Sequence, residues 1–473
     1  MLLHDLLGLA AARTPDAPAL HADGLTRTFA ELDDRAGRLA GVLVANADRG
    51  DRVAVVADNC GAWLEAYYGV PRAGMVLTPL NQRLTATEQA DLLAAAGPTV
   101  LLGQRDRLAA LQPLADRFPT VRTVAAFDGG GWDTLLDAAA PPEPILAQDP
   151  DEPAWLLFTS GTTGRPKGAV LTHRSLLAAT LNTALARPVA HDDVFLTPFP
   201  LCHVAGYNVL VFHLHGRPVV VLPRFRPDEL AAALAEHGVT VASLAPTMLD
   251  SLLDLDADAD LGSLRLITHG AAPMSDSLRR RAADRLGATL SEGYGMTELS
   301  GNAVFDGRPG PLAAVRLDPD TGEILVRGDQ VTAGYWSDPV VTAESFAGDW
   351  FRTGDVGEWR DGLLHVVDRR KDIIITGGEN VASREVEDAL HDHPAVADVA
   401  VVGVPDEHWG EAICAVVVHR HEVTADELVE HVRTRLAGFK KPRHVVFVEA
   451  LPRNASGKVR KDELRRIAAR HLG

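Results

Sequence analysis

Apolar and polar positions follow two different periods along this chain, and their alternation organises most of the sequence. Apolar residues three and four apart predict helices at 29–44, 62–70, 176–186, 229–237 and 275–286. Short apolar runs between them predict strands at 52–57, 75–79, 155–158, 194–197, 218–222, 239–244 and 264–268. Strands that alternate with helices form mainly parallel sheets covered by helices, so an α/β fold is expected.

The pattern changes twice in the C-terminal third. Segments 322–328 and 363–367 suggest antiparallel β structure. The tail then has an alternation of its own, with helices at 385–391 and 424–436 and strands at 399–402, 413–418 and 444–448. We therefore predict an N-terminal domain of stacked, mainly parallel sheets plus a β subdomain (1–368) and a small α+β C-terminal domain (369–473). The boundary falls at Asp368–Lys371.

Composition limits the classes of partner. The chain has 473 residues and a formal net charge of −18, which disfavours a nucleic-acid partner. Its three cysteines, at 60, 202 and 414, form no metal or redox motif, so a reducing cytoplasm is expected. The N-terminus predicts an amphipathic helix rather than a signal peptide, and no apolar run is long enough to span a membrane.

The stretch Leu157–Gly168 carries the clearest chemistry. After an apolar strand it reads Thr-Ser-Gly-Thr-Thr-Gly-Arg-Pro-Lys-Gly, a mixture of hydroxyls, glycines and one lysine, Lys167. Glycines let the backbone approach a ligand, and hydroxyls with a lysine bind oxyanions, as a polyphosphate requires. A flexible linker is the alternative, but the strands predicted on both sides, at 155–158 and 169–171, disfavour it. The spacing is not GxxxxGK[ST], which disfavours a Walker-type NTPase.

This order of residues resembles the phosphate loop of the adenylate-forming superfamily, which includes acyl-CoA synthetases, aryl-CoA ligases, luciferases and peptide-synthetase adenylation domains. Further strings resemble motifs of the same superfamily in the same order, and the resemblance covers almost the whole chain. They are Ser291–Glu298, Thr353–Asp355, Val367–Asp372, Gly377–Val381 with Ser383–Glu387, and Pro452–Lys458. One departure is a compressed segment at 299–321.

The resemblance implies a role for particular residues. Thr297 would contact the α-phosphate or the substrate carboxylate, Glu298 would hold Mg²⁺, and Tyr294 would stack on adenine. Asp355 and Arg369 would bind the ribose; without the other motifs, each would be read as a turn residue or a solvated charge. The full set with an implied role in binding ATP or the thiol cofactor is Thr159, Ser160, Gly161, Thr162, Thr163, Gly164, Lys167, Gly270, Ala271, Ala272, Glu292, Gly293, Tyr294, Asp355, Arg369, Lys371, Gly378 and Glu379.

The resemblance also implies that the C-terminal domain is mobile. Lys458 would reach the α-phosphate and substrate carboxylate, where negative charge builds up; a solvated surface lysine is the alternative. Rotation about Asp368–Lys371, with Lys371 as pivot, would then withdraw the lysine and bring in a pantetheine tunnel. Gly378 and Glu379 lie in the segment that would line this tunnel, although a plain helix-capping loop also fits it.

The acyl pocket is expected between Pro198–Tyr207 and Thr268–Pro273, with His203 closing over the carboxylate unless it is a structural histidine. No acid occurs in Val204–His215, which disfavours an α-amino acid substrate. Arg217, Arg224 and Arg226 either meet a second carboxylate or are solvated.

The expected activity is ATP- and Mg²⁺-dependent ligation of a fatty, aryl or small dicarboxylic acid to coenzyme A, by a monomer or homodimer. The catalytic residues would be Lys458, Thr297, Glu298 and His203. Two alternatives stay open. The acyl group could pass to the phosphopantetheine of a carrier protein, or the chain could be a non-catalytic nucleotide-binding relative.

Overall fold

A computed structural model describes the chain except for residues 143–147, 160–165, 256–260, 271–273, 275, 377–378, 407, 455–456 and 473. By compactness the chain divides into two units. Unit 1 comprises 1–273, 280–314 and 326–351, and unit 2 comprises 274–279, 315–325 and 352–473. The predicted division at 368/369 stays a prediction, because compactness alone does not locate a hinge.

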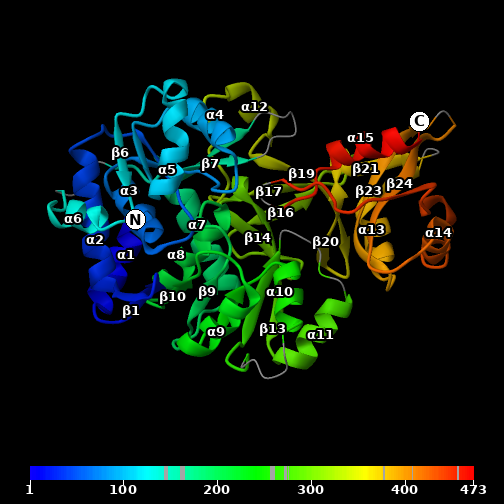
Figure 1. Cartoon of the computed structure of the whole chain (residues 1–473), viewed down its shortest axis with the longest axis horizontal. Coiled ribbons are helices and arrows are strands. Elements are labelled where there is room, and N and C mark those ends of the chain that lie inside the picture. Colours follow the sequence, from blue (N-terminus) through cyan, green and yellow to red (C-terminus); the bar gives the residue numbers. More distant parts are fainter. Residues whose placement is uncertain are drawn as a thin grey trace. The chain divides into compact units, whose positions relative to one another are not determined.

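Six strands of unit 1 form a sheet in the order β6-β5-β3-β4-β7-β8. Figure 1 labels β6 and β7 of this sheet. All are parallel except β8, which pairs antiparallel with β7. The bounds are β3 Arg52–Val56, β4 Val76–Pro79, β5 Val100–Gly103, β6 Thr123–Ala126, β7 Pro153–Thr159 and β8 Lys167–Thr172. The predicted mainly parallel sheet is confirmed.

A second sheet of unit 1 has nine strands in the order β15-β14-β13-β12-β11-β9-β10-β1-β2. Its central strands are parallel, and β2, β14 and β15 are antiparallel to their neighbours. The bounds are β1 Pro18–Ala22, β2 Leu25–Thr28, β9 Phe195–Thr197, β10 Val219–Val221, β11 Val241–Ser243, β12 Leu266–Gly270, β13 Thr289–Met296, β14 Gly301–Phe305 and β15 Arg308–Pro309.

Several helices of unit 1 share one core with both sheets, whereas Leu93 and Leu111, on two other helices, pack in a second cluster with the six-stranded sheet. The largest buried side chains of the shared core include Trp63, Trp155 and Phe29. The bounds are α1 Leu3–Arg13, α2 Phe29–Val44, α3 Gly61–Arg72, α4 Ala86–Ala96, α5 Arg105–Leu111, α6 Gly131–Asp137, α7 His173–Ala186, α8 Tyr207–Leu214, α9 Pro227–His237, α10 Pro246–Leu253 and α12 Pro339–Glu344, with 3₁₀ turns η1 Gln112–Arg117, η2 Val204–Gly206 and η3 Thr297–Leu299. Helix α11 (Asp276–Leu286) has residues in both units.

A third sheet confirms the predicted antiparallel β structure, and its residues are divided between the two units. Its order is β16-β17-β19-β18, with β20 antiparallel on β19. The bounds are β16 Ala314–Leu317, β17 Glu323–Arg327, β18 Phe346–Ala347, β19 Trp350–Arg360 and β20 Leu363–Arg369.

The C-terminal sheet of unit 2 has the order β22-β21-β24-β23, with β25 parallel to β24. The strands are β21 Ile373–Thr376, β22 Glu379–Ala382, β23 Val396–Asp406, β24 Gly410–His419 and β25 His444–Phe447. The helices are α13 Ser383–His391, α14 Ala425–Arg433 and α15 Lys461–Leu472, with 3₁₀ turns η4 Arg370–Asp372 and η5 Gly438–Lys440.

Strand β23 explains how this small sheet holds helices on both faces. Val399 and Val401 pack in one cluster with residues of α13 and α14, whereas Ala400 and Val402 pack in another with residues of α15. Successive side chains of a strand point to opposite faces, so an uninterrupted apolar run covers both. The α+β architecture predicted for the tail is confirmed.

Local sequence signals account for several element boundaries. Thr85 caps α4, and Glu88, three residues later, completes the capping box. Helix α14 ends at Arg433 rather than at 436, because Thr434 forms its C-cap. The compressed segment 299–321 forms β14, β15 and β16. No helix in the described ranges is long and apolar enough to cross a membrane.

Candidate active site

The predicted phosphate loop closes a β-hairpin in unit 1. Strands β7 and β8 end in register at Thr159 and Lys167, which face each other across the ladder. The hydroxyl oxygen of Thr159 lies 3.4 Å from the carbonyl oxygen of Lys167. Ser160, Gly161, Thr162, Thr163 and Gly164 lie outside the described residues.

Glu298 lies beside the base of this hairpin. Its Oε1 atom accepts a hydrogen bond of 3.0 Å from the Tyr335 hydroxyl and lies 3.4 Å from Thr159 Oγ1. Lys167 Nζ lies 5.6 Å from the centroid of the Tyr335 ring. Burial, and then the Glu298 carboxylate, raise the pKa of the Tyr335 phenol, so this hydroxyl stays protonated and donates.

Neutral hydroxyls are thus the neighbours of this carboxylate. Within the described part of the chain, no lysine or arginine forms an ion pair with Glu298. No three His, Cys, Asp or Glu side chains of the described residues group closely enough to bind a metal by themselves. Mg²⁺ commonly binds through one or two carboxylates and the phosphates of its substrate, so this donor set fits Mg²⁺ with a nucleotide.

The position of Glu298 follows from close backbone packing around β13. Gly270 and Gly293 are register partners on β12 and β13. A Cβ added to Gly270 would lie 2.4 Å from the Gly293 carbonyl oxygen, and one added to Gly295 would lie 2.1 Å from the Gly301 carbonyl oxygen. These glycines let three strands approach closely, and η3 then presents Thr297 and Glu298.

The structure gives the positions of other predicted residues of this region, while their roles stay predictions. Tyr294 is half-buried and Glu292 is exposed, both on β13. Ala271 and Ala272 lie outside the described residues. His203 is half-buried and forms the N-cap of η2, immediately before α8.

In unit 2, the two residues predicted to bind ribose face each other. Asp355 on β19 and Arg369 on β20 are cross-strand partners, and Arg369 Nε lies 3.4 Å from Asp355 Oδ1. Gly354, with φ of +74°, turns the backbone before Asp355. The Thr353 hydroxyl accepts a hydrogen bond from the Asp355 N–H. A buried aspartate beside an exposed arginine is thereby fixed within the β19–β20 ladder.

Lys458 lies on an exposed, tightly bonded loop of unit 2. Its N–H donates to Asn454 Oδ1 at 2.9 Å, and its carbonyl accepts from the Asn454 N–H at 2.8 Å. Gly457 adopts φ of +81°, as expected for a glycine-containing turn. Arg453 at the start of the loop forms an ion pair of 2.7 Å with Asp398 on β23.

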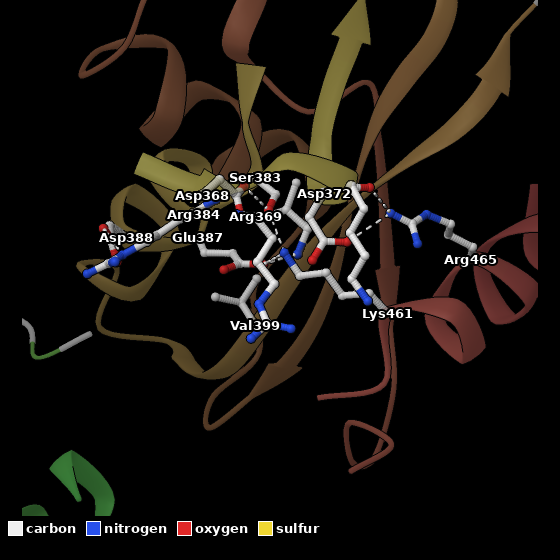
Figure 2. A network of polar contacts seen from close by, with 12 residues as sticks. Asp368, Arg369, Asp372, Ser383, Arg384, Glu387, Asp388, Val399, Lys461 and Arg465 are labelled. Atoms are coloured by element: carbon white, nitrogen blue, oxygen red, sulfur yellow. Dashed lines mark hydrogen bonds and ion pairs between the residues drawn. The ribbon is translucent and has the colours of Figure 1, made fainter. Parts of the chain in front are cut away.

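Figure 2 shows a polar network between the predicted hinge and helix α15. Lys461 Nζ lies 2.9 Å from Glu387 Oε1 and donates to the Ser383 hydroxyl. Ser383 in turn donates to Asp368 Oδ2 at 2.5 Å. One ammonium group therefore compensates two carboxylates, directly and through a hydroxyl.

A second link joins the same helix to the 3₁₀ turn η4. Arg465 Nη2 lies 3.1 Å from Asp372 Oδ1 and 3.4 Å from the Lys371 carbonyl oxygen (Figure 2). Lys371 itself is exposed, as is Glu379 on β22, whereas Gly378 lies outside the described residues. We call Asp368, Asp372, Ser383, Glu387, Lys461 and Arg465 the hinge network.

Sequence reasoning missed Tyr335 and, in the hinge network, the two cations Lys461 and Arg465. Tyr335 follows a glycine in a loop, and nothing in its immediate sequence indicates a carboxylate 37 residues away. Lys461 and Arg465 are spaced one helical turn apart, which placed them on a common face but did not identify their partners.

Comparison with known proteins decides the family. The pattern of the AMP-binding enzyme family matches residues 8–336, and that of the AMP-binding enzyme C-terminal domain matches residues 385–458. The chain belongs to this family. It is 38% identical to a feruloyl-CoA synthase of Amycolatopsis sp., over 96% of this chain and 97% of that protein. It is 34% identical to the long-chain-fatty-acid–CoA ligase FadD13 of Mycobacterium tuberculosis, over 93% and 92%.

A solved structure agrees. The o-succinylbenzoate CoA synthetase (MenE) of Bacillus subtilis, in complex with its acyl-adenylate intermediate OSB-AMP, superposes with a TM-score of 0.88 at 31% identity, covering 97% of each chain. The present chain is therefore an adenylate-forming α/β protein of the acyl-CoA synthetase branch. It is an ATP-dependent carboxylic acid–CoA ligase that uses ATP, Mg²⁺ and CoA.

Proposed function

We propose that this ligase activates an aryl or cyclic carboxylic acid, with Glu298 and Lys458 serving the adenylation step. One observation supports the assignment of Glu298. Its carboxylate lies beside the hydroxyls of Thr159 and Tyr335, and no lysine or arginine of the described residues forms an ion pair with it. The 38% identical relative is named a feruloyl-CoA synthase, which supports an aryl acid.

The proposed residues act by positioning and charge neutralisation. The substrate carboxylate attacks the α-phosphorus of ATP, and pyrophosphate leaves. Lys167 and the hydroxyls of its hairpin hold the phosphates, Asp355 and Arg369 hold the ribose, and Lys458 neutralises charge at the α-phosphate. Mg²⁺ bound by Glu298 supplies charge neutralisation on the phosphates. Thiol attack on the acyl-adenylate then releases AMP.

We further propose that CoA, rather than a carrier protein, is bound through its nucleotide at an exposed aromatic surface of unit 2. Trp409 is 36% exposed, and Arg443 Cζ lies 4.0 Å from the centroid of a Trp409 ring. Exposed aromatic rings beside a guanidinium suit a base and a phosphate. Arg443→Ala should raise KM for CoA but not for free pantetheine, which lacks the nucleotide.

The two half-reactions test the role of Lys458. Lys458→Ala should lower pyrophosphate release about 10²- to 10³-fold, the usual effect of losing one transition-state donor. Thiolysis of supplied acyl-adenylate should be largely retained. Arg460→Ala, in the same exposed loop region, is the control and should leave both rates near wild type. Equal loss of both half-reactions in Lys458→Ala would contradict the proposal.

His203 is tested separately. His203→Ala should raise KM for the acid several-fold more than KM for ATP, because this residue caps η2 ahead of α8, in the segment expected to line the acyl pocket. An unchanged KM for the acid would place it outside the acyl pocket.

A further inference from the structure

A small cavity in unit 1 lies where the acyl pocket is expected. Its volume is about 20 Å³. Asn208, Val211 and Phe212 line it from one face of α8, at helical spacing, and Thr268 lines it from β12. Helix α8 continues directly from Pro198–Tyr207, and Thr268 begins the other predicted wall. The cavity therefore adjoins both predicted walls of the acyl pocket.

Arg187, the C-cap of α7, also lines this cavity and has donor capacity to spare. Its Nε donates to Ser291 Oγ at 2.8 Å, and its Cζ lies 4.9 Å from the centroid of the Phe305 ring. Its Nη2 is buried and has no hydrogen-bond partner. No carboxylate of the described residues forms an ion pair with it; Ser291 donates instead to Asp306, at 2.7 Å.

Burial lowers the pKa of the Arg187 guanidinium, which remains a cation at any physiological pH. A charged donor buried without a partner is costly, and such groups normally find an acceptor. The missing acceptor must be small, because a cavity of this volume has room for about one oxygen-sized group and not for a ring.

A second arginine lining the same cavity gives a direct contrast. Arg265 is bound by both oxygens of Asp193, with Nε 2.6 Å from Oδ1. Its guanidinium is thus paired directly with a carboxylate, whereas Asp306 and Glu292 act on Arg187 only beyond ion-pair distance and leave its Nη2 without an acceptor. Arg217, Arg224 and Arg226, the cations that the sequence singled out, do not line the cavity.

We propose that Nη2 of Arg187 binds an oxygen acceptor at the end of the acid remote from the reacting carboxylate. The acceptor is a hydroxyl, a carbonyl or a second carboxylate. This inference rests on the proposed activation of an aryl or cyclic acid and narrows it to acids with an oxygen at the distal position. Arg187 is then a specificity-determining residue, since a substrate that lacks the acceptor leaves a buried donor unpaired.

A panel of acids that differ only at the distal position tests the inference. Phenylpropenoic acids with a para hydroxyl, formyl or carboxylate group are compared with the para-methyl acid by pyrophosphate release. The wild type should favour at least one oxygen-bearing acid about 10- to 100-fold in kcat/KM. The three oxygen groups distinguish a hydroxyl, a carbonyl and a carboxylate acceptor.

Arg187→Met should abolish this preference, because methionine fills a similar volume without a donor. Arg187→Lys should retain part of it, and Arg265→Met should leave the ratio between acids unchanged. A wild-type enzyme without preference, or an unchanged ratio in Arg187→Met, would overturn the inference and leave Arg187 a structural residue that binds water. Absence of pyrophosphate release with every acid would instead contradict the proposed function, so the two failures are distinct.

Discussion

Two groups of carboxylates, one in each unit, have opposite relations to positive charge. In the hinge network, Glu387 Oε1 forms an ion pair with Lys461 and accepts a hydrogen bond from the Val401 N–H. Asp372 forms an ion pair with Arg465. Glu298, by contrast, accepts a hydrogen bond of 3.0 Å from the neutral phenol of Tyr335 and lies 3.4 Å from the neutral hydroxyl of Thr159. A carboxylate compensated by its own chain stabilises the fold, whereas one without a cation retains capacity for a ligand. The contrast sets Glu298, which is proposed to hold Mg²⁺, apart from the acids of the hinge network; it does not extend to Asp355, which is proposed to bind ribose and is paired with Arg369.

The largest expected effect comes from neutralising Glu298. Glu298→Gln keeps the shape of the side chain but removes the charge that the proposed Mg²⁺ needs. We expect pyrophosphate release to fall about 10²- to 10³-fold, with a raised Mg²⁺ requirement. Thermal unfolding should be nearly unchanged, since no ion pair is lost. A lower melting temperature with normal Mg²⁺ dependence would reverse the comparison and make Glu298 a structural acid.

The opposite pattern is expected for Lys461 in the hinge network. Its side chain is only 17% exposed and compensates Glu387 and, through Ser383, Asp368. Lys461→Met should reduce the free energy of unfolding of the C-terminal part by about 1.5–3 kcal/mol, measured by denaturant unfolding.

A matched control for that change lies on the same helix. Arg466 pairs with Asp462 at the surface and its side chain is 65% exposed. Arg466→Met should cost about 0.5 kcal/mol or less, because exposed pairs contribute little. Equal destabilisation by the two substitutions would show that the hinge network is no stronger than a surface ion pair.

Removing the phenol that faces Glu298 should have the smallest effect. Tyr335→Phe deletes one hydrogen bond to the carboxylate, and we expect the Mg²⁺ requirement to rise about five- to tenfold. Because the pKa of Tyr335 is raised, the wild type should show no loss of this donor between pH 7 and 9. The contrary result would be a Mg²⁺ requirement that rises between pH 7 and 9 in the wild type but stays constant in Tyr335→Phe. It would mean that the phenol ionises in this range.

The elements of the fold were largely predictable because local patterns determine them. The apolar run 155–158 and the strand expected at 169–171 predicted both strands of the β7–β8 hairpin. The order of strands within each sheet was not predictable, since it depends on which apolar faces meet. The β1–β2 hairpin was missed; the exposed residues of β2 leave it without an apolar run.

The candidate site was predictable where residues lie within one motif. Asp355 and Arg369 were identified separately, but their pairing depends on the register of β19 and β20. Arg187 resembles a solvated cation at the end of a helix, and only the packing of β13, β14 and α8 buries it. Burial and long-range contacts therefore decide what residue types alone leave open.

The anchoring of α15 restricts how the Lys458 amine can travel. Lys461 is held by α13 and lies three positions after Lys458, so their Cα atoms are at most about 11 Å apart when the chain is fully extended. On the other side, Arg453 fastens the same loop to β23. Because both ends of this short loop are fixed to the C-terminal sheet and its helices, the loop cannot carry Lys458 far by itself. In the proposed role of Lys458, its amine would therefore move together with α15 and the C-terminal sheet rather than on a mobile loop of its own.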